Sequence, residues 1–217
     1  MAKTQLPYNP TEEKINVWTH KTGIFLSLIA LVLMLLKTIP SHDSYKIISS
    51  LIYGLSLITL YTASTLYHRE TNIKRRRYLN IFDHAAIFIL IAGTYTPFAL
   101  VTLKGFTAGL LLAVIWSIAG IGIWLKFYFT GRYEKLSTLL YLIMGWLVIF
   151  FIKPLMMALP LQGLYWLIAG GLFYTIGAIF FSLNKIKFNH AIFHVFVLWG
   201  SLAHFIAIYI YVLTPHH

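Results

Sequence analysis

Seven long apolar stretches, separated by short polar connections, follow one another along the chain. Each is about 20 residues long, which is the length that a helix needs to cross a bilayer and is too long for a barrel strand. The pattern therefore predicts an all-α protein, an integral membrane bundle of seven transmembrane helices. The expected spans cover residues 22–39, 46–67, 81–103, 107–127, 136–153, 161–182 and 190–212.

A polar segment precedes the first of these stretches. The sequence Asn9-Pro10-Thr11-Glu12 is typical of a helix start, with an asparagine N-cap, a proline at the first helical position and a glutamate placed for a capping box. We expect a short interfacial helix here, within a cytoplasmic N-terminal segment of residues 1–21. The sequence shows no internal repeat and no separate soluble domain, so residues 1–217 should form a single seven-helix membrane domain.

The composition agrees with a membrane protein and limits the chemistry. Of the 217 residues, 59% are hydrophobic and 11% are charged, whereas a soluble domain has about 25% charged residues. The chain has no cysteine, which excludes disulfides, iron–sulfur clusters and thiol chemistry. Any bound metal must therefore be held by histidine and oxygen ligands.

The distribution of Lys and Arg predicts the orientation of the chain. The N-terminal segment and the second, fourth and sixth connections carry thirteen of these residues, and the other side carries four. Because the side richer in Lys and Arg faces the cytoplasm, we expect the N-terminus inside and the C-terminus outside, in a multi-pass protein of the cell inner membrane. The net charge of +11 reflects this asymmetry and does not indicate a nucleic-acid partner. The run Lys74-Arg75-Arg76-Arg77 is a topology signal and could also gather anionic lipid headgroups.

Several ionisable side chains should lie at one depth in the bundle. His68 ends the second span, Asp83 begins the third, and His190 and His194 open the seventh. At 1.5 Å per residue, all four lie within roughly 10 Å of the predicted cytoplasmic surface. His190 and His194 are four residues apart and share a helix face, and Ser64 and His68 repeat that spacing.

Three imidazoles that converge, with a carboxylate nearby, are typical of an open zinc site. Zinc in such a site lowers the pKa of a bound water to about 7, so Asp83 could act as general base and Ser64 could steady the water. The alternatives are that the histidines only pack between helices, that Asp83 pairs with His84 or a loop arginine, and that the Ser64 hydroxyl bonds its own backbone.

Two further sets of polar residues are less easily assigned. Glu13, Asn16 and His20 are spaced by three and four residues, so they form either part of the cytoplasmic cavity or a solvated helix face. His204 lies about 15 Å along the helix from His194, too far to share its metal, and should be a buried hydrogen-bonding residue.

The order and spacing of these residues match a known family pattern. The chain resembles the bacterial hemolysin III proteins, the prokaryotic branch of the progestin and adipoQ receptor family, which is related to alkaline ceramidases. The resemblance spans nearly the whole chain and rests on Glu13-x-x-Asn16-x-x-x-His20-x-x-Gly23, Ser64-x-x-x-His68, Asp83, His190-x-x-x-His194 and His204.

The resemblance implies a seven-helix fold with the N-terminus inside. It further implies zinc bound by His68, His190 and His194, with Asp83 beside the zinc water and Ser64 close to it. A hydrolase activity on lipid amides or esters has been inferred for the family, and bacterial members are linked to membrane lipid homeostasis.

Three functions therefore remain open. The first is a zinc-dependent hydrolase of acyl lipid amides or esters, which serves lipid homeostasis and has membrane lipids as its partners. The second is a non-catalytic membrane sensor in which zinc is structural. The third is a pore-forming or cytolytic protein, although the outer halves of the spans are too apolar for a polar track across the membrane.

Overall fold

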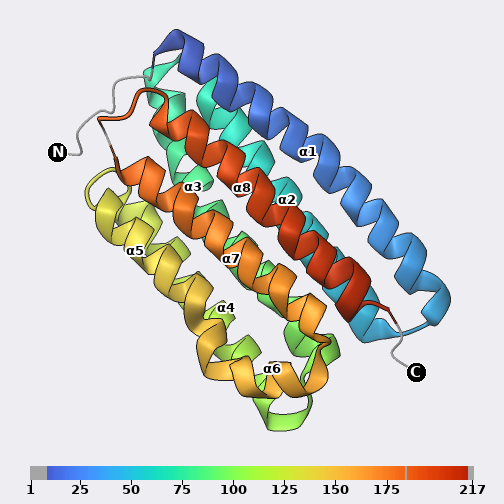
Figure 1. Ribbon diagram of the computed structural model, residues 1–217. Helices are drawn as coiled ribbons and strands as arrows, with labels where there is room; N and C mark the ends of the chain where they lie inside the picture. Colours follow the sequence, from blue (N-terminus) through green and yellow to red (C-terminus); the bar gives the residue numbers. More distant parts are fainter. Residues whose placement is uncertain (1–8, 184, 215–217) are drawn as a thin grey trace.

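The computed structural model describes residues 9–183 and 185–214, and every regular element in these ranges is helical (Figure 1). Seven helical segments are long and apolar enough to cross a membrane, which confirms the predicted fold class. Residues 1–8 of the expected N-terminal segment lie outside the described residues. The main helices are α1 (Pro10–Thr38), α2 (Ser44–Arg69), α3 (Ile73–Pro97), α4 (Gly105–Phe129), α5 (Glu134–Gly145), α6 (Ile152–Ala158), α7 (Leu161–Ser182) and α8 (Asn189–Ile206). Four short helical segments accompany them: η1 (Ile39–Ser41), η2 (Phe98–Thr102), η3 (Trp146–Phe151) and η4 (Ala207–Val212).

The beginning of α1 differs from the prediction. The Asn9 side chain accepts a hydrogen bond from the Thr11 N–H at 2.9 Å, as expected of an N-cap. The helix then continues to Thr38 without a break, because residues 11–38 contain no proline. The predicted short helix is therefore the first part of the helix that carries the first span, and not a separate element.

The third helix also begins earlier than predicted. Asn72 caps α3 by accepting hydrogen bonds from the N–H groups of Lys74 and Arg75 at 3.0 and 3.2 Å. The basic run at residues 74–77 is therefore helical and forms the first turn of α3. Asp83 lies almost three turns into this helix, rather than at its start.

The fifth span is interrupted where α5 gives way to η3 and then to α6. A tyrosine from α3 bonds the backbone at this break. The Tyr95 hydroxyl donates to the Gly145 carbonyl at 2.6 Å and accepts from the Val148 N–H at 2.8 Å. An irregular backbone inside a membrane is tolerated where protein groups bond it, so Tyr95 stabilises the break.

The bundle has two layers. In Figure 1, α1, α8, α7 and α5 lie side by side in the nearer layer, and α2, α3 and α4 lie behind them. Helix α2 packs along both α1 and α3, α8 packs along α7, and α1 also contacts α8.

The Tyr61 hydroxyl of α2 donates to Ser201 Oγ of α8 at 2.7 Å, and the hydroxyl of Tyr174 from α7 lies 2.8 Å from the same oxygen. These bonds join three helices, and the start of α1, the end of α2 and the start of α8 meet at one end of the bundle.

Candidate metal centre

Three histidines come together at this end of the bundle. His68 lies in the last turn of α2, and His190 and His194 lie in the first two turns of α8. Each contributes one ring nitrogen to a group whose atoms all lie within 4.8 Å of one another. The side chains are buried, with exposed fractions of 3%, 6% and 1% for the three residues. The convergence predicted from their matching depth is confirmed.

A carboxylate fixes the ring of His68. Glu13 Oε2 lies 2.6 Å from His68 Nδ1, and the Arg76 guanidinium donates to the other oxygen of the same carboxylate. Because Nδ1 carries the hydrogen that bonds Glu13, Nε2 is the nitrogen that would bind a metal. Asn16 Nδ2 lies 3.4 Å from the same Nδ1 atom.

A second carboxylate of α1 holds the start of α8. Phe188 precedes α8 with φ of 60° and offers no side-chain cap. Glu12 supplies the missing acceptor from another helix, because its Oε1 accepts a hydrogen bond from the His190 N–H at 3.2 Å. Glu12 was expected to close a capping box on its own helix, and this contact replaces that role.

His194 is supported from α1 as well. Thr19 Oγ1 lies 3.5 Å from His194 Nδ1, and the His20 ring stacks on the His194 ring with centroids 3.6 Å apart and an interplanar angle of 11°. Both His20 nitrogens are buried without a hydrogen-bond partner among the described residues. Since Asn16 and His20 are buried, the solvated-face interpretation of this set is wrong.

Ser64 and Asp83 line one cavity together with His190, His194 and His20. Asp83 makes no hydrogen bond or ion pair within residues 9–183 and 185–214, so the alternative pairing with His84 or a loop arginine is not found. The Ser64 hydroxyl likewise makes no bond to its own helix in the described part of the chain, whereas the hydroxyl of the next residue, Thr65, bonds the Tyr61 carbonyl at 2.7 Å.

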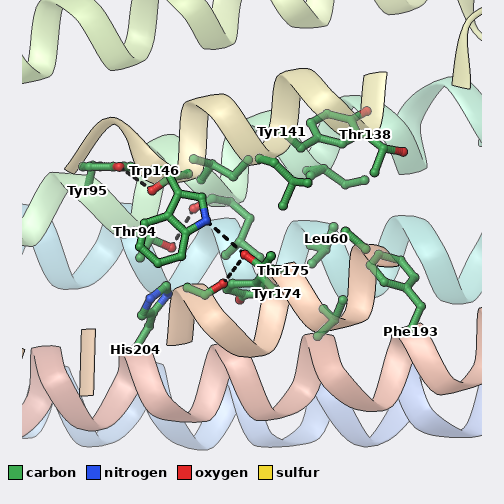
Figure 2. Close-up of a pocket in the computed structure, with 18 of the residues that line it drawn as sticks. Leu60, Thr94, Tyr95, Thr138, Tyr141, Trp146, Tyr174, Thr175, Phe193 and His204 are labelled. Atoms are coloured by element: carbon green, nitrogen blue, oxygen red, sulfur yellow. Dashed lines mark hydrogen bonds between the residues drawn. The ribbon is translucent and has the colours of Figure 1, made fainter. Parts of the chain in front are cut away.

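The cavity has a volume of about 180 Å³ and extends from the histidines toward the other end of the bundle. Figure 2 shows Thr138, Tyr141 and Phe193 toward one end and Tyr95, Trp146 and His204 toward the other. Between them the walls are largely apolar and include Leu60, Ile91 and Val197. His204 is 8% exposed and lies 3.1 Å, through Nε2, from the Leu167 carbonyl, as expected for a buried hydrogen-bonding residue outside the metal group.

Sequence reasoning missed Glu12 and Arg76. A signal for Glu12 was present, because residues 12, 16, 20, 23 and 27 follow the helical repeat and form the buried face of α1. Arg76 belongs to a run of four basic residues, and only the rotation of α3 distinguishes it from its neighbours. It is 9% exposed and stacks over the Tyr67 ring at 4.5 Å.

The residues present fit a zinc ion. Three imidazoles from two helices can leave a fourth position open, and a carboxylate behind one ring is the usual outer support of a histidine ligand. Other divalent ions accept the same donors, so the geometry is not selective for zinc alone.

Comparison with known proteins places this arrangement in a family. Residues 8–205 match the family described as Haemolysin-III related. Hemolysin-3 of Bacillus cereus is 46% identical over 202 residues, which cover 93% of this chain and 92% of that protein. The Hemolysin-3 homolog of Bacillus subtilis (strain 168) is 45% identical over 200 residues, which cover 92% of this chain and 94% of that one. The human Monocyte to macrophage differentiation factor is 30% identical over 215 residues, which cover 94% of this chain and 87% of that protein.

Proposed function

This chain belongs to the haemolysin-III-related family, and on that premise we propose that it is a zinc-dependent membrane hydrolase of acyl lipid amides or esters, which serves membrane lipid homeostasis. One observation carries the proposal. Three histidine nitrogens converge, and two of these histidines, His190 and His194, line an apolar cavity that is also lined by an unpaired carboxylate, Asp83. Burying an ionisable group in apolar surroundings costs free energy, so a group found there usually has a function.

The apolar lining and the volume of the cavity support an acyl lipid as substrate. Its walls of Leu60, Ile91 and Val197 suit a hydrocarbon chain, and its volume of about 180 Å³ is many times what one water needs. The chain of the substrate would lie along these walls, with the scissile carbonyl at the histidine end and the headgroup toward the nearer membrane surface.

The chemistry divides between the ion and the protein. When bound, zinc would lower the pKa of a water molecule to about 7 and polarise the substrate carbonyl. Asp83 accepts a proton from the attacking water and passes it to the nitrogen or oxygen that leaves. A C–O bond forms from the water and the amide C–N or ester C–O bond breaks, which yields a fatty acid and an amine or alcohol. Ser64 orients the water through its hydroxyl.

The first test is the metal content of protein purified without a histidine tag. About one zinc per chain is expected for the wild type, none for His194→Ala, and an unchanged content for His204→Gln, a control on the same helix outside the group. Metal in neither the wild type nor the control would leave the histidines as packing residues and would contradict the proposal.

The second test separates metal binding from turnover. Asp83→Asn should keep the zinc and lose hydrolysis of fluorescent ceramide and acyl ester probes in detergent micelles, because the proton acceptor is removed. If wild-type protein with zinc turns over none of the probes while metal removal lowers its melting temperature, the structural-zinc sensor is the better description. Hydrolysis by metal-free His194→Ala would contradict both interpretations.

A further inference from the structure

A second hollow adjoins His68, which does not line the cavity. It is a groove of about 1140 Å³ between the start of α1, the end of α2, the connection at residues 70–72, the start of α3 and residues 127–131 at the end of α4. Glu13 and His68 line it, whereas Ser64, Asp83, His190 and His194 do not. Tyr67 lines both hollows, so the groove adjoins the cavity and differs from it in the other residues that line it.

Basic side chains dominate this groove. Glu13 is bonded to Arg76 and His68, and the Glu70 carboxylate accepts the Asn72 N–H at 2.8 Å. Six basic and two acidic residues give a formal charge of 6 − 2 = +4. The basic residues are Lys14, Lys21, Arg69, Lys74, Arg76 and Arg77, and the acidic residues are Glu13 and Glu70. Among these residues, only Arg76 and Glu13 form an ion pair within the part of the chain that the structure describes.

The rim of the groove is aromatic. Trp18, Phe127 and Tyr128 line it and are exposed to 68%, 54% and 64%. The Lys21 ammonium lies 5.2 Å from the centre of the Trp18 ring. Exposed Trp and Tyr beside Lys and Arg are typical of the level at which lipid headgroups meet the hydrocarbon. A ligand here would meet both positive charge and an apolar rim.

We propose that this groove binds the phosphate group of an anionic phospholipid. Five basic side chains without an ion pair in the described part of the chain surround a space that a phosphate can enter, and they come from three helices: Lys14, Lys21, Arg69, Lys74 and Arg77. Phosphate accepts several charge-assisted hydrogen bonds at once, and the aromatic rim can cover the first methylene groups of the acyl chains. A free phosphate ion would use the basic side chains and leave the rim without a role. The inference does not depend on the proposed hydrolysis, because it concerns binding alone.

The test compares matched charge changes in the full chain. Purified protein in an uncharged detergent is titrated with phosphatidylglycerol or phosphatidylcholine, and native mass spectrometry counts the bound lipids. Lys74→Gln/Arg77→Gln should weaken phosphatidylglycerol binding about thirtyfold. That factor corresponds to about 1 kcal/mol for each of the two basic residues near the anionic headgroup. Lys135→Gln/Lys185→Gln removes the same charge from exposed positions outside the groove and should change binding by less than about twofold, because distant charges are screened.

Each outcome either supports the lipid site in the groove or overturns it. Preference for phosphatidylglycerol, lost only in the groove variant, supports the site. Equal losses in both double variants would overturn it, because they would mean diffuse charge attraction. Equal binding of phosphatidylcholine would also overturn it, because the groove would then not recognise the charge of the lipid. Displacement of the lipid by millimolar inorganic phosphate would overturn the assignment to a lipid. If the groove variant does not fold, Lys74→Arg/Arg77→Lys keeps the charge and should keep binding, and its loss in folded protein would also overturn the proposal.

Discussion

The contact between Glu13 and His68 allows a quantitative test of the candidate metal centre. Glu13→Gln keeps the size of the side chain and removes the charge that holds His68 Nδ1 at 2.6 Å. A hydrogen bond to a charged group contributes about 1.5–3 kcal/mol, which is roughly 10- to 100-fold in metal affinity if the bond orients the ring only in the bound state. Measured losses on removal of such outer partners of histidine ligands fall in about the same range, 10- to 100-fold. We therefore expect zinc binding to weaken by that factor without a change in stoichiometry.

The same substitution also affects stability, and the two effects can be separated. Removal of the Glu13 charge leaves the Arg76 guanidinium, whose side chain is only 10% exposed, without its partner. An uncompensated buried charge costs about 3–5 kcal/mol, and partial exposure of this pair reduces that cost. Arg76→Gln in the Glu13→Gln background removes the unpaired charge and should recover much of the stability while zinc binding stays weak.

Zinc affinity is measured by competition with a chromophoric chelator, and stability by thermal unfolding in detergent. Glu70→Gln is the matched control, because Glu70 lies at the same end of the bundle and its carboxylate bonds only the Asn72 N–H within residues 9–183 and 185–214. This control should bind zinc like the wild type. Equal zinc affinities for Glu13→Gln and Glu70→Gln would refute the argument that Glu13 positions a ligand.

Three further predictions concern other contacts. Glu12→Ala should lower the free energy of unfolding by about 1 kcal/mol, measured by thermal unfolding, because α8 loses the acceptor that caps its first turn. Tyr95→Phe should cost about 1–3 kcal/mol in the same measurement, because the break after α5 loses its bonds at Gly145 and Val148, and an unchanged melting temperature would contradict this. The chain has no cysteine, so single substitutions can report its orientation. An impermeant maleimide should label Ser41→Cys on intact cells and Thr71→Cys only after lysis, and the reverse result would invert the proposed topology.

Depth was predictable from the sequence because it depends on one number, the rise of 1.5 Å per residue. Counting from the connections placed His68, His190 and His194 at one level, and the structure brings their nitrogens together. The spans at residues 161–182 and 190–212 were located to within one residue for a second reason. Long apolar runs end where polar residues begin, and this boundary can be read from the sequence.

Rotation about each helix axis was not predictable in the same way. Glu12 and Glu13 are four and three residues from Asn16, and a repeat of 3.6 allows either to share its face. In the structure both reach the site, Glu12 toward α8 and Glu13 toward α2. The break after α5 escaped prediction because the hydroxyl that stabilises it belongs to α3, and no local pattern around residues 145–151 records that contact.

The way α2 and α8 are joined predicts how the protein should respond to metal removal. At one end they meet through His68, His190 and His194, and farther along the Tyr61 hydroxyl bonds Ser201 at 2.7 Å, a contact that needs no ion. A ligand present at 100 times its Kd stabilises the folded state by about 2.7 kcal/mol, so a chelator should lower the melting temperature by several degrees. The helical content measured by circular dichroism should stay unchanged at 25 °C, because the contacts along the rest of both helices remain. Complete unfolding by the chelator would mean that the ion, rather than the packing, holds α2 against α8, and the centre would then be structural.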